Sequence, residues 1–379
     1  MNNNKDNDSL APYTLYKSDV SYFSGKLEAY MNYKGIPHNS VDMNLKNMNQ
    51  VVENTGVKKV PAVKTADNSW LFDTTPMLQW FEKRYPQNPI LPQDPALRFI
   101  ALLLEDYGDE WLWRPAMWWR WMPRASRWAV GYRIGAEIAP SLLARPMGWY
   151  FGRRQLKEWL WDDGMTRKNE ADVRDMLYRE FEFLEPLLEE QPYLLGSHPS
   201  AADFGFFASL FRHFGNDPES AEVVRRQAPN TYEWLARLWN SNPKKLPREQ
   251  VWTWPKGKMW HALLERIAKD YLPYLQQNAK AFSDGQKRFK HVGNTFEFKN
   301  SKTTHYRVYC REVLQQEFNQ LSSADQARVN ELFSAHGGLE ALHGDGVIES
   351  GLAPQFVLPR TQGNYKQTLS QLIFGQPRN

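Results

Sequence analysis

Residues 13–37 read YTLYKSDVSYFSGKLEAYMNYKGIP and contain a complete strand–turn–helix unit. The run Tyr13–Tyr16 is rich in β-forming side chains, and the polar turn Lys17–Ser21 follows it. Apolar residues then recur at helical spacing as far as Tyr33, and Gly35 ends the pattern. The stretch predicts an α/β unit in which the last residue of the turn opens a helix.

The same kind of alternation continues to residue 91. We expect a second strand at residues 39–42, then two strands at Lys59–Val63 and Trp70–Phe72 that form a hairpin across a polar turn. Asp73 opens a further helix with a capping residue and a proline close behind it. Four prolines between residues 86 and 95 then indicate a linker. Residues 12–91 therefore predict the order βαβ followed by ββα.

The rest of the chain is predicted to be mostly helical. Residues 96–245 carry helical patterns throughout, and Ser200 with Asp203 forms a capping box before an apolar run. Residues 250–379 predict further helices and one possible hairpin at 288–299. We expect an α+β architecture: an α/β domain at 12–91, an all-α domain at 96–245, and a mainly helical C-terminal extension at 250–379 that packs on the second domain.

Four motifs occur in this order: LYKSDVSYFSGK at 15–26, Val60-Pro61, DTTP at 73–76, and SAAD at 200–203. As an ordered set they resemble the glutathione S-transferase family, and the resemblance covers residues 12 to about 240. It implies a thioredoxin-like first domain that binds glutathione and an all-helical second domain that supplies the substrate pocket. Each motif alone is weak, whereas the ordered set is specific.

The resemblance implies which residues form the site. Ser21 matches the position of the catalytic serine, and Val60 with Pro61 matches the valine and cis-proline that hold the glutathione backbone. Asp73 and Thr74 match the acid and hydroxyl that hold the γ-glutamyl end. The family keeps its catalytic hydroxyl at several neighbouring places, so three other residues remain rivals of Ser21, namely Tyr22, Ser24 and Tyr16.

Physical chemistry gives these residue types the same roles. A serine hydroxyl at a helix N-terminus can donate to a sulfur anion, and the positive end of the helix dipole favours thiolate over thiol. The carboxylate of Asp73 suits an α-amino group, while the Thr74 hydroxyl and the free N–H groups of the first helical turn suit a carboxylate. The sequence therefore predicts a site for a γ-glutamyl thiol peptide.

Nine of the 16 tryptophans lie between residues 111 and 161, together with nine Lys and Arg and only two acids. Three interpretations stay open. Tyr107, Trp111 and Trp113 could line an apolar pocket for an electrophile. The tryptophans could instead pack helix faces with Arg stems across their rings. A basic amphipathic surface that touches anionic lipid or nucleic acid is the third interpretation.

Several classes of protein are excluded by what the sequence lacks. It has no His pair or Cys pair at metal-ligand spacing and no nucleotide-binding glycine motif, so we expect neither a metal nor a nucleotide. The co-substrate that the resemblance implies is glutathione. The lone Cys310 precludes an intrachain disulfide and fits a reducing compartment. The N-terminus is polar and no apolar run reaches spanning length, so we expect a cytoplasmic protein without a membrane or nucleic-acid partner.

The expected function is that of a glutathione transferase: the chain activates the glutathione thiol for attack on a small apolar electrophile, in detoxification. The alternative is a non-catalytic binding or interaction protein with the glutathione-transferase fold, since a fold can persist when its chemistry is lost. A homodimer is expected from the resemblance alone.

Overall fold

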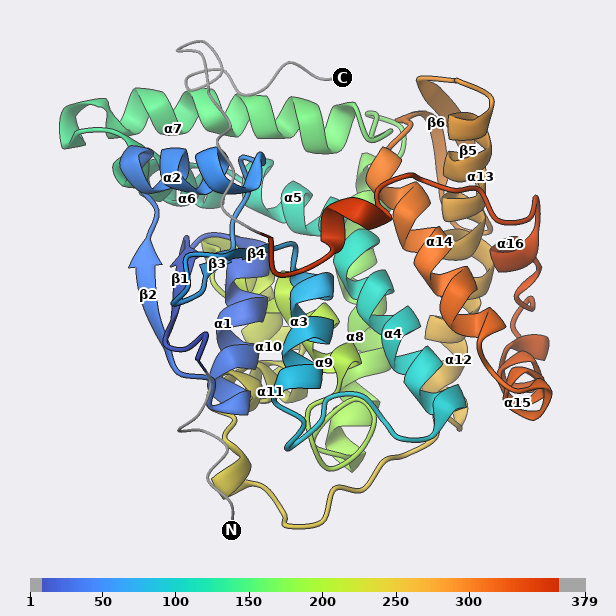
Figure 1. Cartoon of the computed structure of the whole chain (residues 1–379). Helices are drawn as coiled ribbons and strands as arrows, with labels where there is room; N and C mark the ends of the chain where they lie inside the picture. Colours follow the sequence, from blue (N-terminus) through green and yellow to red (C-terminus); the bar gives the residue numbers. More distant parts are fainter. Residues whose placement is uncertain (1–8, 361–379) are drawn as a thin grey trace.

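The computed structural model describes residues 9–360, and the chain begins with a small α/β unit (Figure 1). Its sheet has the strand order β2-β1-β3-β4, in which β1 and β2 are parallel and the other pairs are antiparallel. The elements of this unit are β1 (Tyr13–Lys17), α1 (Tyr22–Lys34), β2 (His38–Asp42), α2 (Leu45–Thr55), β3 (Ala62–Lys64), β4 (Trp70–Phe72) and α3 (Thr74–Arg84). This is the predicted βαβ–ββα order of a thioredoxin-like domain.

Side chains that alternate along the strands give the sheet two buried faces. Leu15 and Val63 point toward α1 and α3 and belong to the main core. Their chain neighbours Tyr16 and Ala62 point the other way, into a small cluster with Val51 of α2. The helices therefore cover both faces of the sheet, and only its ends and edges remain available for a site.

The second part of the chain is a bundle of helices, as predicted. Single π-helical turns at Lys157–Trp161 and Leu210–Phe214 continue two of them. The helices are α4 (Pro95–Glu110), α5 (Trp113–Trp121), α6 (Arg124–Ile138), α7 (Ser141–Leu156), α8 (Glu170–Glu190), α9 (Ala201–Ser209), α10 (Pro218–Gln227) and α11 (Pro229–Trp239).

The centre of this bundle is the crossing of α4 and α9. Ser200 and Asp203 form the predicted capping box at the start of α9, and both are fully buried. Gly108 of α4 lies directly against Gly205 of α9, where a Cβ on Gly108 would stand 2.5 Å from the Gly205 carbonyl carbon. The two backbones can approach this closely only because neither residue has a side chain.

The C-terminal extension is mainly helical and contains one antiparallel hairpin. Its elements are α12 (Lys258–Arg266), a π-helical turn (Ile267–Tyr271), α13 (Leu272–Ser283), β5 (Arg288–Val292), β6 (Glu297–Lys302), α14 (His305–Asn319), α15 (Ser323–Ser334) and α16 (Glu340–His343). Short 3₁₀ turns occur at Pro243–Lys245 and Ala353–Phe356. Residues 361–379 of the predicted extension lie outside the described part.

The extension packs on the second domain, as expected, and also reaches the first. Figure 1 shows α14 and α15 beside α4, and the following segment returns to the sheet. There Arg360 forms an antiparallel bridge with Trp70 of β4, and Phe356 packs on Phe72 with ring centroids 6.1 Å apart. The extension therefore covers the outer edge of the sheet beside the end that carries the predicted site.

In Figure 1, α7 runs along one rim of the molecule and α6 lies beneath it at the level of α2, and the two helices pack together as a hairpin. Small residues let the two helices pack closely, because Gly131 meets Gly148 and Gly135 meets Ala144 at backbone contact. None of the helices within residues 9–360 has the length and apolar character that a membrane span requires.

Candidate functional site

The three segments that carry the predicted site residues meet at one end of the sheet. Ser21 follows β1, Val60 precedes β3, and Asp73 follows β4. Tyr16 near the end of β1 is paired with Ala62 at the start of β3, and the end of β4 is paired with the same β3 residue. The fold thus brings together residues that are about 50 positions apart in sequence.

Ser21 is the N-cap of α1. Its backbone is extended, with φ −82° and ψ 128°, and its side-chain oxygen accepts a hydrogen bond from the Ser24 amide at 3.3 Å. The hydroxyl itself lies 3.5 Å from the carbonyl oxygen of Val60, at the upper limit for a hydrogen bond. The donor of Ser21 is therefore only weakly engaged, at the positive end of a helix.

The three rivals of Ser21 are buried, whereas Ser21 is only half-buried. The Tyr22 hydroxyl donates to the Gly108 carbonyl oxygen at 2.6 Å, inside the interface with α4. The Ser24 oxygen accepts a bond from a backbone amide at 3.3 Å, and the Tyr16 hydroxyl donates to a glutamine of α2 at 3.1 Å. Of the four hydroxyls, that of Ser21 is thus the best placed to meet a ligand.

The peptide bond between Val60 and Pro61 is cis, as the resemblance implied. Val60 is half-buried, and its side chain packs against the cluster under α2. Thr74 is the first residue of α3 and is buried, so its hydroxyl lies at the beginning of that helix.

Asp73 has an unusual backbone conformation, with φ 69°. Non-glycine residues rarely adopt the left-handed region, and where they do the backbone is strained. Asp73 is the N-cap of α3, yet its side chain makes no capping bond; its carboxylate instead accepts a hydrogen bond from the Tyr306 hydroxyl at 2.9 Å. The carboxylate is thus turned away from its own helix and toward α14.

The environment of Asp73 shifts its ionisation. Burial raises the pKa of Asp73 to about 6, although the charge of Lys59 and the hydrogen bond from Tyr306 both lower it. Protonation of this carboxylate therefore falls close to neutral pH, where a change in its surroundings alters its charge.

Sequence reasoning missed Tyr306. This residue lies on α14 of the extension, 233 positions after Asp73, and the Lys59 ammonium lies 5.5 Å from the centre of its ring. Because the motifs of the resembled family end near residue 240, nothing in the sequence pointed to this residue.

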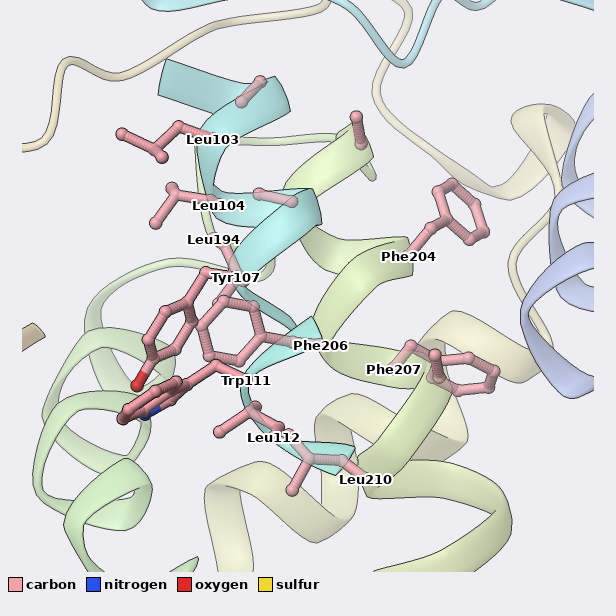
Figure 2. Close-up of a cluster of buried hydrophobic side chains, with 14 of the residues drawn as sticks. Leu103, Leu104, Tyr107, Trp111, Leu112, Leu194, Phe204, Phe206, Phe207 and Leu210 are labelled. Carbon is pink, nitrogen blue, oxygen red and sulfur yellow. The ribbon is translucent and has the colours of Figure 1, made fainter. Parts of the chain in front are cut away.

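The structure corrects the expectation for Tyr107 and Trp111. Both side chains are fully buried in the core beside Phe206 (Figure 2). The Tyr107 hydroxyl donates to Glu180 at 2.8 Å, and the Arg114 guanidinium covers the Trp111 ring at 5.3 Å. Neither side chain lines an open pocket, and Trp111 fits the interpretation in which Arg packs across an aromatic ring.

Trp113 is half-buried. Its ring stands edge-on to Trp159 with centroids 4.2 Å apart, and its indole N–H donates to Asp163 at 3.3 Å. Its role in an electrophile pocket stays a prediction.

A small cavity of about 40 Å³ lies between α3, α4 and α14. Its lining residue Thr75 follows Asp73 by two positions in the sequence. Thr75, Asp106, Tyr306 and Cys310 are among its lining residues. The volume suits a water molecule or two and is too small for a peptide. Cys310 is buried, and burial raises the pKa of its thiol well above the usual value, which makes it a poor nucleophile.

Two family models match the chain: the N-terminal domain of glutathione S-transferases over residues 15–89, and the C-terminal domain of the same family over residues 146–242. The chain belongs to the glutathione S-transferase family. In this chain the part that matches the N-terminal domain contains Ser21, Val60 and Asp73. The extension after residue 242 lies beyond both matched domains.

Individual relatives are distant. An isoprene-epoxide–glutathione S-transferase of Rhodococcus sp. (strain AD45) is 20% identical over 228 residues, which are 58% of this chain and 92% of that protein. Glutathione S-transferase U6 of Arabidopsis thaliana is 29% identical over 93 residues, 24% of this chain and 41% of that protein. Among solved structures, a β-etherase from Sphingobium sp. strain SYK-6 has a TM-score of 0.43 and 19% identity, with 60% of this chain and 95% of that chain covered.

Proposed function

We propose that this glutathione S-transferase binds glutathione at the end of its sheet and activates the thiol for attack on a small apolar electrophile. The observation that carries the proposal is the placement of Ser21, whose weakly engaged hydroxyl caps α1 beside Val60. Two factors would hold the bound sulfur as thiolate, namely a hydrogen bond from Ser21 and the partial positive charge of the α1 N-terminus. The protein then borrows its nucleophile from the peptide.

The rest of the peptide has partners nearby. The Val60 backbone would hold the central residue, and the carboxylate of Asp73 would pair with the α-amino group of the γ-glutamyl end. Thr74 and the first-turn amides of α3 would receive the α-carboxylate. In this arrangement the peptide spans from the start of α1 to the start of α3.

A second candidate is a protein that binds glutathione without turnover, and the contact between Tyr306 and Asp73 favours it. The Tyr306 hydroxyl already occupies one oxygen of the carboxylate that would pair with the ligand. The burial of Tyr107 and Trp111 also removes two residues expected to receive an electrophile.

One experiment separates the two candidates. The full chain is applied to immobilised glutathione, and turnover of glutathione with a chloronitroaromatic electrophile is measured in parallel. Retention with turnover supports the transferase, whereas retention without turnover of any electrophile in a broad panel supports the binding protein. Absence of both would overturn the proposed function.

A homodimer and a role in detoxification remain proposals that rest on family membership, and a cytoplasmic location remains a proposal that rests on the single cysteine. Light scattering of the purified chain tests the first of these. A monomer would refute the proposed homodimer.

We expect glutathione affinity to fall as the pH falls through about 6, because Asp73 must be ionised to pair with an ammonium group. Tyr306→Phe removes a hydrogen bond that stabilises the ionised form, so the pKa of Asp73 should rise further. One lost hydrogen bond corresponds to an upward shift of roughly 0.5 to 1 pH unit in the midpoint of the curve of glutathione affinity against pH. Calorimetric titration with glutathione between about pH 5 and pH 8 would measure it.

Tyr309→Phe is the matched control, since Tyr309 lies one turn further along α14 and no hydrogen bond to Asp73 is found for it. Its midpoint should equal that of the unmodified protein. Equal midpoints for both variants would mean that Tyr306 does not act on the ligand-binding carboxylate.

A further inference from the structure

The hairpin of α6 and α7 exposes the largest apolar side chains on the described surface. Leu142 is 92% exposed, Trp149 60% and Trp128 56%, and Tyr132 is also exposed. Within residues 9–360, no other tryptophan is exposed to this degree. Exposed aromatic and aliphatic groups that gather on one element indicate a contact surface.

These side chains share one side of the hairpin. Tyr132 directly follows Gly131 in α6, and Trp149 directly follows Gly148 in α7, where the two glycines meet at the seam between the helices. Because the helices are antiparallel, equal offsets from the seam place both rings on the same side. Trp128 lies one turn before Tyr132, and Leu142 lies two turns before Trp149. We call these four residues the hairpin face.

The surroundings of the hairpin face are strongly positive. Four exposed arginines lie on the two helices, and within the described part of the chain no ion pair is found for any of them: Arg124, Arg127, Arg145 and Arg153. Arg133 is also exposed, but its charge stabilises the ionised carboxylates of Asp19 and Glu137, so it belongs to the side of the hairpin that faces the protein. The hairpin contains one acid, Glu137, whose carboxylate accepts bonds from the Ser18 hydroxyl at 2.8 and 3.0 Å and so faces the protein. The guanidinium of Arg153 also lies over the Trp149 ring, at 5.0 Å.

We propose that the hairpin face docks on the anionic surface of a lipid bilayer as a peripheral contact. Tryptophan and tyrosine suit the boundary between headgroups and acyl chains, while arginine stems cross that boundary and place the charge among anionic headgroups. This replaces our expectation from the sequence that the chain has no membrane partner. The contact is independent of the proposed transferase activity.

Charge and shape disfavour the other occupants. A twofold dimer would set the same patch against itself, so that unpaired arginines would face arginines. A single nucleic-acid strand would stack on the aromatic rings but would leave Leu142, at the tip of the hairpin, without a partner. A bilayer satisfies the arginines and the leucine together.

The test is sedimentation of the full chain with two kinds of vesicle, phosphatidylcholine alone and phosphatidylcholine mixed with phosphatidylglycerol. We expect binding to the anionic vesicles, little binding to phosphatidylcholine, and weaker binding as salt is raised. Trp128→Ser/Trp149→Ser and Arg127→Gln/Arg145→Gln should each weaken binding by at least about tenfold. Circular dichroism of each variant would show that the fold is kept.

Arg225→Gln/Arg226→Gln is the matched control, because these exposed arginines of α10 pair with Glu222. It removes the same charge and should leave binding unchanged. Equal loss in this control, or no binding to anionic vesicles at low salt, would overturn the proposal. Binding that appears only after deletion of residues 361–379, or hairpin variants that change the oligomeric state and not the vesicle binding, would also overturn it.

Discussion

Replacement of Ser21 by alanine is expected to lower the turnover of glutathione with an aromatic electrophile by about 100-fold. The hydroxyl is the side-chain donor placed at the N-terminus of α1, and removal of one donor to a developing or stabilised anion typically costs 10² to 10³ in rate. The thiol pKa should then move back toward the value of about 8.5 for a free thiol. Affinity for glutathione should change little, because its backbone and γ-glutamyl contacts remain.

The measurement is kcat/KM as a function of pH. In the unmodified protein the rate should reach its plateau near neutral pH, and in Ser21→Ala the rising limb should move to higher pH. Loss of the helix cap is a separate effect of about 1 kcal/mol on stability. Ser21→Asp separates the two effects. Aspartate keeps the cap, so stability should be retained, whereas turnover should fall because the carboxylate donates no proton and repels a thiolate.

Tyr22→Phe is the matched control for this prediction. Its hydroxyl donates to Gly108 within the core, so the variant should lose about 1 kcal/mol of stability and keep its turnover. If Tyr22→Phe abolished turnover while Ser21→Ala left it intact, the catalytic hydroxyl would have been assigned to the wrong residue.

The architecture could be predicted because its signals are local. The strand–turn–helix order at 13–37, the hairpin before Asp73 and the capping box at Ser200 each depend on neighbouring residues, and the structure contains all three. The strand register then follows from alternation, which buries Leu15 and Val63 on one face and Tyr16 on the other.

The surroundings of the site could not be predicted, because they depend on contacts across the whole chain. Tyr306 reaches Asp73 from an extension that no motif covers. The same extension explains the error over Trp111, because the rings of Tyr274 and Phe298 pack edge-on against its ring and help to bury it.

The tryptophan-rich stretch divides in a way that composition could not reveal. Trp111 and Trp121 are completely buried, whereas Trp128 and Trp149 are exposed on the α6–α7 hairpin. The difference arises because the seam of the hairpin is built from glycine and alanine, which leaves the large side chains to point outward.

Replacement of Lys26 by methionine is expected to cost about 3 to 5 kcal/mol of unfolding free energy at neutral pH. The Lys26 ammonium is completely buried between the carboxylates of Glu105 and Asp109, so it ties α1 of the first domain to α4 of the second. Without it, two buried carboxylates face each other with no counter-charge. Urea denaturation of the variant and the unmodified chain would measure the loss.

The loss should depend on pH, with a sign that follows from Asp109. Burial raises the pKa of Asp109 well above its usual value, and removal of the neighbouring ammonium should raise it further. A carboxyl whose pKa is higher in the folded than in the unfolded state favours folding at low pH and loses that contribution as the pH rises through its folded pKa. The variant should therefore be closer to the unmodified protein at pH about 5 than at pH about 8.

Two further variants decide whether charge or packing is responsible. Lys26→Met combined with Glu105→Gln and Asp109→Asn removes all three charges and should recover most of the lost stability, because no uncompensated ion remains. Lys269→Met breaks a half-exposed pair with Glu265 and should cost less than about 1 kcal/mol. If the triple variant were as unstable as Lys26→Met alone, the lysine would stabilise the domain interface through its packed stem and not through its charge.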